Sequence, residues 1–354
     1  MKQFLPFKQV ETDSQVVVVD AMHHHGLIYS HWRGAPKLAG LHDDTSLGIV
    51  LNAIKAGHEG VDYPLVTNNH FDVDGFLGVW SLFEPALALR YEAAFREAAL
   101  IGDFREYDPN RTGADLGLKL VCWLNEIERR DFYQPFGAKD EAEACVPKYE
   151  YCLPRFAEVV EHPERFEDVW GPEYAQVIAH TEIIQSAATK LDLLSDIRLL
   201  IVETPEPLHY YALFGQSREA DMVLTTYEGQ RYELEYKYTT WVDTDSRCAY
   251  PRLPFDTLAD QLNAQEASAQ IWWGDRIMDT GPQLRLNSRE LSKLERFDHP
   301  FKREIFPSNI SSEVLKAAIL SHYRMRFAIT APQNAWTWTE MREVAARNAQ
   351  IEKR

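Results

Sequence analysis

The sequence YPLVTNNHFDVDG, residues 63–75, joins an apolar strand pattern to a run in which histidine and aspartate alternate with apolar residues. Residues 63–69 are apolar at their centre, as expected for a short strand, and His70, Asp72 and Asp74 follow at every second position. Alternate residues of an extended segment face the same way, about 6.6 Å apart, so these side chains can share one pocket. The stretch predicts a strand that ends at a polar site.

A first strand is predicted upstream at Val16–Val19, four consecutive β-branched residues that end at Asp20. Between the two strands, Thr45 or Ser46 can cap a helix that closes at Gly57. A strand, loop, helix and strand in this order predict a parallel, right-handed unit.

Helical periodicity continues over residues 76–83 and 85–99, and residues 98–101 are then predicted as a third strand, which ends at Gly102 and Asp103. In open α/β sheets, ligands bind outside the carboxyl ends of the strands. We therefore expect the functional site at this edge of the sheet, with Asp103 beside it.

The composition changes after Pro205 and Pro207, which gives a predicted domain boundary near residue 204. Residues 116–200 are mostly helical in pattern, and beyond the boundary strands are predicted at 209–214, 222–227 and 231–242, a hairpin turn at 228–229, and helices at 256–267, 311–328 and 341–354. The predicted fold class is α/β, with a mostly parallel sheet and flanking helices in residues 1–204 and a smaller C-terminal α+β domain in residues 205–354.

The composition restricts the classes of partner. With 54 Asp+Glu against 37 Lys+Arg the net charge is −17, which disfavours binding of long duplex nucleic acid. The four cysteines form no C-x-x-C pair, and neither a secretory signal nor an apolar run of the ~18 residues needed to cross a bilayer is visible. These features predict a cytoplasmic protein without a membrane partner and leave a homodimer open.

An imidazole with two carboxylates, as at His70, Asp72 and Asp74, suits Mn²⁺, with Mg²⁺ or Zn²⁺ as alternatives. Two ions about 3.5–4 Å apart also need a bridging carboxylate, which Asp103 could supply. An EF-hand is disfavoured because His70 and Ser81 stand where its first Asp and final Glu are required. The alternative is a purely structural turn, in which Asp72 caps the following helix and Asp74 is exposed.

Three consecutive histidines, His23, His24 and His25, follow Asp20 at the end of the first strand. Asp20 could orient one of these imidazoles, and each histidine is a candidate to orient substrate or to protonate a leaving group. A solvated loop is the alternative. His31 and Asp44 occupy the same loop and are interpreted as capping or surface groups.

The pattern His70-x-Asp72-x-Asp74-Gly75 after a strand resembles the DHH phosphoesterase superfamily, in which such residues bind two Mn²⁺ ions. The resemblance covers residues 16–104 and implies that Asp103 is the bridging aspartate. It also implies that Asp20, as a further metal ligand, and the three histidines correspond to the Asp-His-His motif, in permuted order. The phrases SHWRGAP, DDTSLGIVLNAI and NNHFDVDGFLGVW, with the segment Trp241–Arg252, also resemble a bacterial family of uncharacterised proteins.

Arginines offer a way to bind substrate oxygens. Arg247 and Arg252 follow a predicted strand, and Arg33 lies in the first loop. The guanidinium fork binds phosphate with two hydrogen bonds, although an ion pair with a nearby aspartate is an equal alternative for each arginine.

The expected function is a metal-dependent phosphoesterase or phosphohydrolase that acts on a small phosphorylated substrate or a short oligonucleotide end. The same ligands could activate water for an amide or ester. A non-catalytic metal-binding scaffold is the third possibility.

Overall fold

The computed structural model describes residues 2–12, 15–132, 140–237, 241–287, 292 and 298–351. The chain forms two compact units. Unit 1 comprises Met1–Gln176 and Asp243–Ser246, and unit 2 comprises Val177–Val242 and Arg247–Arg354. The predicted boundary near residue 204 compares with a division at 176/177, inside a long helix.

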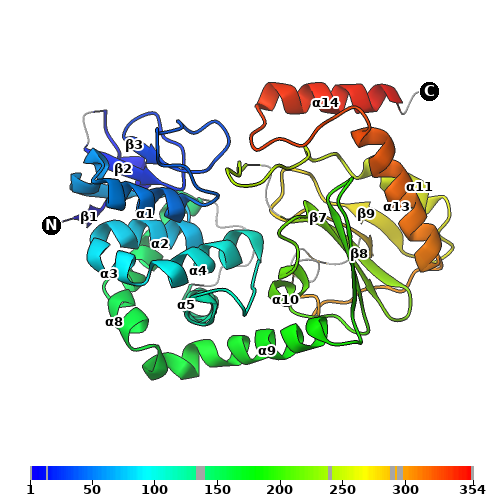
Figure 1. The fold of residues 1–354 in the computed structure, drawn as a ribbon, viewed down its shortest axis with the longest axis horizontal. Helices are drawn as coiled ribbons and strands as arrows, with labels where there is room; N and C mark the ends of the chain where they lie inside the picture. Colours follow the sequence, from blue (N-terminus) through cyan, green and yellow to red (C-terminus); the bar gives the residue numbers. More distant parts are fainter. Residues whose placement is uncertain are drawn as a thin grey trace. The chain divides into compact units, whose positions relative to one another are not determined.

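Unit 1 contains a four-stranded parallel sheet with the strand order β1-β4-β2-β3, of which β1, β2 and β3 are labelled in Figure 1. Its strands are β1 (Gln3–Phe4), β2 (Val16–Val19), β3 (Leu27–Tyr29) and β4 (Leu65–Thr67). In the register, Val17 of β2 lies opposite Val66 of β4 and Leu27 of β3. All four valines of β2 are buried, which is why an uninterrupted apolar run suits this central strand.

Helices cover this sheet and extend unit 1. They are η1 (Phe7–Gln9), α1 (Ser46–Ala56), η2 (Glu59–Asp62), α2 (Val73–Phe83), α3 (Pro85–Arg90), α4 (Glu92–Phe104), α5 (Ala114–Asp131), α6 (Glu141–Ala144), α7 (Val146–Cys152), α8 (Phe156–Glu161), η3 (Pro163–Phe166) and the start of α9 (Glu167–Gln185). A Cβ on Gly78 of α2 would lie 2.6 Å from Val19, so α2 packs directly on β2. Helix α2, which follows β4, is thereby held against the sheet.

Unit 2 contains a six-stranded sheet in the order β5-β6-β7-β8-β10-β9, antiparallel throughout except for the pair β6 and β7. The elements are β5 (Lys190–Leu194), β6 (Leu199–Thr204), α10 (Tyr210–Phe214), β7 (Met222–Tyr227), β8 (Arg231–Tyr236), α11 (Asp256–Asn263), β9 (Ile271–Gly274), β10 (Gln283–Asn287), α13 (Ser312–Phe327) and α14 (Trp338–Ile351). The predicted hairpin between β7 and β8 is confirmed by the pair Tyr227 and Arg231.

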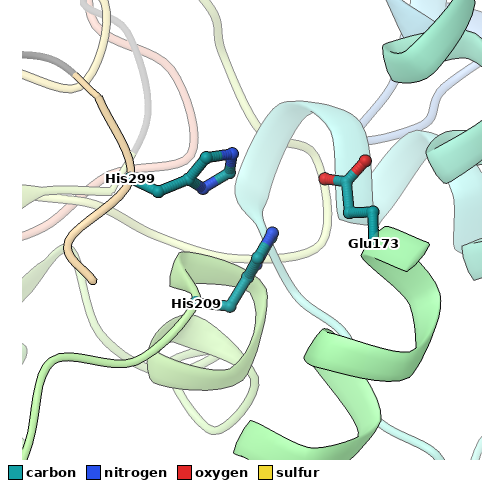
Figure 2. Close-up of side chains that lie close together, drawn as sticks. All are labelled: Glu173, His209 and His299. Atoms are coloured by element: carbon teal, nitrogen blue, oxygen red, sulfur yellow. The ribbon is translucent and has the colours of Figure 1, made fainter. Parts of the chain in front are cut away.

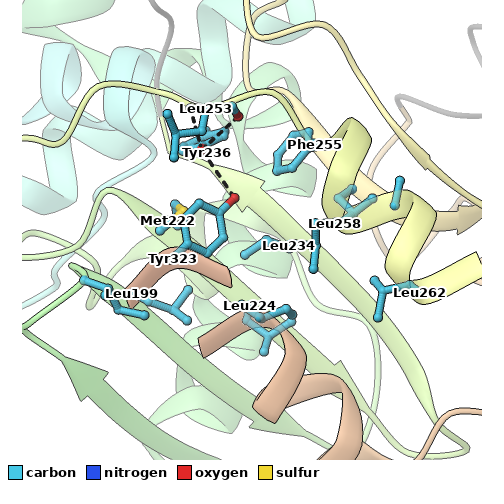
Figure 3. Packing of buried hydrophobic residues seen from close by; sticks show 14 of the residues in the cluster. Leu199, Met222, Leu224, Leu234, Tyr236, Leu253, Phe255, Leu258, Leu262 and Tyr323 are labelled. Carbon is cyan, nitrogen blue, oxygen red and sulfur yellow. Dashed lines mark hydrogen bonds between the residues drawn. The ribbon is translucent and has the colours of Figure 1, made fainter. Parts of the chain in front are cut away.

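One face of this second sheet packs on α11 and α13 (Figure 3). Alternate apolar residues of β7 and β8, among them Leu224 and Leu234, point into this core. Tyr236 is buried there with its hydroxyl hydrogen-bonded to the backbone of Leu253 and to the hydroxyl of Tyr323. The opposite face of β6 and β7 packs on α10. Unit 2 therefore has a core of its own.

The α/β class is confirmed in coarse terms, but several predicted elements are wrong. Residues 98–101 lie inside α4 rather than in a strand, and residues 210–214 form α10. Four apolar residues in a row are compatible with either a buried strand or one face of a buried helix. The helical prediction for 116–200 missed β5 and the start of β6. Residues 238–240 of the predicted strand 231–242 and residues 352–354 of the predicted last helix lie outside the described residues.

Within the described residues, no helix has both the length and the apolar character that a membrane crossing requires.

Candidate metal centre

Three neighbouring strands of unit 1 bring polar residues to one edge of the sheet. Asp20 follows β2 directly, His31 follows β3 after one intervening residue, and His70 follows β4 after two asparagines. Because β2, β3 and β4 are parallel, their carboxyl ends meet at the same edge. These side chains gather at the carboxyl edge of the sheet, which is the location that the sequence predicts for the site.

Asp20 lies between the two histidines. Its Oδ1 is 3.5 Å from Nε2 of His31, and its Oδ2 is 3.2 Å from Nε2 of His70. The carboxylate is almost completely buried, and Oδ1 also accepts a hydrogen bond of 2.7 Å from the hydroxyl of Ser46. Asp20 has a φ of 49°, in the left-handed region that L-residues other than Asn and Asp rarely adopt. The backbone is bent there so that the carboxylate faces the strand edge.

Both histidines are held in the orientation that metal ligands adopt. Nδ1 of His31 donates to the backbone carbonyl of Asp44 at 2.6 Å, and Nδ1 of His70 donates to the amide oxygen of Asn69 at 2.8 Å. When an oxygen acceptor holds the proton on Nδ1, the other ring nitrogen is left to bind a metal. In both residues that nitrogen, Nε2, faces Asp20.

Three further carboxylates lie close to His31 and His70. Oδ2 of Asp72 lies 3.0 Å from Nε2 of His70, while its Oδ1 accepts from the backbone N–H of Gly75 and caps α2. The carboxylate of Asp74 is fully buried and lies 3.9 Å from Nε2 of His31. Asp103, near the end of α4, has its Oδ2 3.4 Å from the same Nε2. The structural-turn alternative is therefore correct for Asp72, which caps the helix, and wrong for Asp74, which is not exposed.

The first backbone N–H groups of α1 hold the carboxylate of Asp74 in place. Its Oδ1 accepts from the backbone N–H of Leu47 at 2.9 Å, and its Oδ2 accepts from that of Ser46 at 2.8 Å. Helix α1 begins here because Thr45 caps it by accepting from the N–H of Gly48, as the sequence predicts. The N-terminus of α1 therefore positions one carboxylate of the centre.

The side chains form two groups that share Asp20. Ligand atoms of Asp20, His70 and Asp72 lie within 4.8 Å of one another, and so do those of Asp20, His31 and Asp74. We call these half-site 1 and half-site 2, and Asp103 adjoins His31 of half-site 2. The expected bridge was Asp103, but the carboxylate that faces both histidines is that of Asp20.

The electrostatics reflect several buried carboxylates in one place. Burial alone would raise the pKa of Asp20, but His70 and His31 lower it to about 2. Burial and the neighbouring carboxylates raise the pKa values of Asp74 and Asp103 well above their ordinary range. Although burial opposes it, Asp72 and Asp20 raise the pKa of His70 well above 6.5. The excess of negative charge at the strand edge favours a bound cation.

The three consecutive histidines do not lie in either half-site. The parallel strands β2 and β3 are joined by residues 20–26 alone, so the loop must turn back from the carboxyl end of β2 to the start of β3. His25 lies at that returning end, with Nε2 3.5 Å from the hydroxyl of Thr12, and Nδ1 of His23 contacts the backbone of His25. The histidine beside Asp20 is His31, which the sequence analysis assigned to a cap or the surface.

The sequence before His31 contains a signal for its position at a strand end. His31 follows Leu27–Tyr29, an apolar triplet that forms β3, just as His70 follows β4. Recognition of this short strand would have identified His31 as the histidine at the strand end. The supporting groups Ser46, Asn69 and Asp44 had no comparable sequence signal.

The predicted substrate-binding arginines lie in both units. The guanidinium of Arg33 forms an ion pair with Asp243 at 2.7 Å, which was the alternative interpretation. Arg247 and Arg252 are buried residues of unit 2, where the Arg252 guanidinium lies 5.7 Å from the ring centroid of Tyr236. Their part in substrate binding stays a prediction.

Histidines also gather in unit 2, where the ring centroids of His209 and His299 are 4.6 Å apart (Figure 2). Nδ1 of His209 accepts from the N–H of Tyr211 and caps α10, and Tyr210 stacks on His299. Glu173, drawn in the same figure, belongs to unit 1. Within unit 2 these rings form an aromatic stack around the start of α10.

Comparison with known proteins gives one family. No curated protein and no solved structure matches the chain. A family model described as a family of unknown function, DUF6687, matches residues 1–334, which include both half-sites and most of unit 2. The chain therefore belongs to the DUF6687 family.

Proposed function

We propose that this protein is a metal-dependent phosphohydrolase whose centre binds two divalent ions, one in each half-site, with Asp20 between them. The observation that carries the proposal is the arrangement of Asp20 and its two histidines. Each oxygen of one buried carboxylate faces the Nε2 of a histidine whose Nδ1 is already hydrogen-bonded to an oxygen. Preorganised imidazoles around a shared carboxylate are what a dinuclear site requires.

The donor set fits the proposed ions. Half-site 1 offers one imidazole and two carboxylates, and half-site 2 offers one imidazole and two carboxylates with Asp103 adjacent. Mixed oxygen and nitrogen donors without a thiolate suit Mn²⁺, with Mg²⁺ or Zn²⁺ as alternatives. The raised pKa values of Asp74 and Asp103 also fit, because a cation would replace the protons that these carboxyls hold.

The choice of a phosphorylated substrate rests on resemblance. His70, Asp72, Asp74 and Gly75 form the motif that resembles the DHH phosphoesterase superfamily, and a DHH-like arrangement is part of the proposal. The net charge of −17 favours a small phosphorylated molecule or a short oligonucleotide end over a long duplex. The substrate class is thus inferred from the motif and the charge together.

The residues of the two half-sites would have different roles. Asp20 holds both half-sites in register, and Asp74, fixed on the N-terminus of α1, keeps half-site 2 rigid. Two divalent ions would supply Lewis acidity, which lowers the pKa of a water and neutralises charge on phosphoryl oxygens. Substrate would approach from half-site 1, because the side chains of Asp72 and His70 are 43% and 19% exposed, whereas those of Asp20 and His31 are 3% exposed.

The test is a substrate panel run with Mn²⁺ on the full chain. It contains a phosphomonoester, a phosphodiester, pyrophosphate, a short oligonucleotide, an amide and an ester. We expect Mn²⁺-dependent turnover of at least one phosphorylated compound, reduced at least 100-fold in Asp72→Asn. Asp192→Asn is the charge-matched control, since Asp192 lies exposed on β5. Hydrolysis of only the amide or ester, or metal binding without turnover, would contradict the proposal.

A further inference from the structure

A short segment from far along the chain packs beside half-site 2. Residues 243–246 belong to unit 1, although they follow β8 in the sequence. The carboxylate of Asp44 accepts three hydrogen bonds from this segment: Oδ1 from the backbone N–H groups of Asp245 and Ser246, both at 2.7 Å, and Oδ2 from the hydroxyl of Ser246 at 2.6 Å. Asp44 is buried, so these bonds are shielded from water.

The same segment also holds the other end of the loop that carries His31. The backbone N–H of Asp243 donates to the carbonyl of His31 at 2.9 Å, and the Asp243 carboxylate pairs with Arg33 at 2.7 Å. The loop from His31 to Asp44 is therefore tied at its first residues by Asp243 and at its last residue by Asp245 and Ser246.

Asp44 connects this segment to the metal centre. Its backbone carbonyl accepts the Nδ1 proton of His31 at 2.6 Å, while its side chain is held by Asp245 and Ser246. The position of that carbonyl determines both which nitrogen of His31 carries the proton and where Nε2 points. A shift of Asp44 would turn Nε2 of His31 away from Asp20 and Asp74.

We propose that residues 243–246 form a clip that positions His31, through Asp44, and so completes half-site 2. Asp44, Asp243 and Ser246 are positioning residues in this proposal, which rests on the proposed dinuclear centre. Half-site 1 is oriented by a different group, because Asn69 rather than Asp44 accepts the Nδ1 proton of His70, although the Trp32 ring of the tied loop also contacts His70, with 5.6 Å between ring centroids. The clip therefore acts chiefly on one of the two ions.

The experiment measures Mn²⁺ binding to the full chain by calorimetry and by the electron paramagnetic resonance signal of coupled Mn²⁺ pairs. Ser246→Ala removes one donor and keeps the backbone bonds, and Asp44→Asn keeps the backbone carbonyl that His31 uses. Asp192→Asn is the control for loss of one negative charge. We expect the clip variants to weaken one Mn²⁺ site by 10–100-fold and to lose the coupled signal, with the other site unchanged.

The outcomes are distinct. Two sites of wild-type affinity in both Ser246→Ala and Asp44→Asn, or equal weakening of both sites, would overturn the clip while leaving the proposed function in place. A wild-type chain that binds no Mn²⁺ would overturn the proposed function and the clip with it. The coupled signal distinguishes a change in the orientation of His31 from a loss of folding stability. If a variant only destabilised the fold, the molecules that remain folded would still bind two interacting ions and give the coupled signal.

Discussion

Asp20 combines three structural properties. It is buried, it adopts a left-handed φ of 49°, and its two oxygens face different histidines. A left-handed conformation costs about 1–2 kcal/mol for most residues, and it persists where the surroundings over-determine it, which is common at functional sites. Ser46 and His70 provide that constraint here through hydrogen bonds to the carboxylate.

Asp20→Asn should remove both ions, because a shared ligand contacts each of them. Asn tolerates the left-handed conformation, so the backbone at this position is preserved. Asp72→Asn, which changes half-site 1 alone, should weaken one ion only. Metal content per chain after equilibrium dialysis with Mn²⁺ measures the difference. If Asp20→Asn retained one tightly bound ion while Asp103→Asn lost both, the bridge would be Asp103 after all.

Asp103→Asn should stabilise the metal-free chain at neutral pH. Burial and nearby carboxylates raise the pKa of Asp103 above the value of about 3.9 that it has when unfolded. The folded state therefore prefers the neutral form, and the metal-free chain loses stability as the pH rises from about 4 through the raised pKa. Asn mimics the neutral carboxyl and removes that loss.

The midpoint of thermal unfolding measures this effect. Calorimetry without and with Mn²⁺ distinguishes the stability of the metal-free chain from that of the metal-bound chain. We expect the unfolding midpoint of unit 1 to rise by about 2–4 °C in EDTA, the shift that ~1 kcal/mol produces in a unit of this size. With Mn²⁺ the order reverses, because the variant lacks a carboxylate near half-site 2. A lower midpoint in EDTA would show that the Asp103 carboxylate is stabilised in the apo chain, contrary to its raised pKa.

At the level of elements, the parts that follow from local chemistry are predictable from the sequence. The valine run forms β2, Thr45 caps α1, Gly57 ends α1 in the left-handed conformation, and Ser311 caps α13. Each depends on the shape or hydrogen-bonding of a side chain toward its own neighbours in the chain. His70, Asp72 and Asp74 all reach the strand edge, but not through the predicted alternation of an extended segment. Asp72 is the N-cap of α2 and Asp74 lies in the first turn of that helix.

The parts that depend on long-range packing were not predictable in the same way. Residues 98–101 form part of α4 because their apolar side chains pack within the helical layer, which local periodicity cannot distinguish from a strand. The role of His31 depends on β3, a strand of three residues that exists through its pairing with β2. The position of Asp20 between His31 and His70 depends on the register of β2 between β3 and β4.

Gly75, the first glycine of α2, is predicted to be required at the metal centre. A Cβ there would lie 2.2 Å from Nδ2 of the buried Asn68 and 3.3 Å from Oδ2 of Asp20. Gly75→Ala should therefore displace both groups, lower Mn²⁺ affinity at least tenfold and cost about 1–3 kcal/mol of stability, as overpacking does. Isothermal titration and urea unfolding measure the two effects.

Gly171→Ala in α9 is the matched control, because a Cβ at Gly171 meets only Glu167 at an ordinary 3.5 Å. This variant should bind Mn²⁺ like the wild type and gain about 0.5–1 kcal/mol in helix stability. Wild-type Mn²⁺ binding by Gly75→Ala would show that the space beside Asn68 has no importance for the centre.

For the whole molecule, metal binding should be coupled to pH as well as to folding. An ion stabilises the folded chain by about 2.7 kcal/mol when its concentration is 100 times Kd. Binding must displace protons from Asp74, Asp103 and His70, whose pKa values are raised. The rise in unfolding midpoint that Mn²⁺ produces should therefore be larger at pH 8 than at pH 6. An equal rise at both values would mean that these groups do not titrate on binding.

The most direct test of the dinuclear centre is the anomalous scattering of manganese in crystals of the Mn²⁺-loaded chain. The account predicts two peaks about 3.5–4 Å apart on either side of the Asp20 carboxylate. One peak should lie beside His70 and Asp72, and the other beside His31, Asp74 and Asp103. Fully loaded crystals with no peak in contact with Asp20, or with a single ion bound elsewhere, would contradict it.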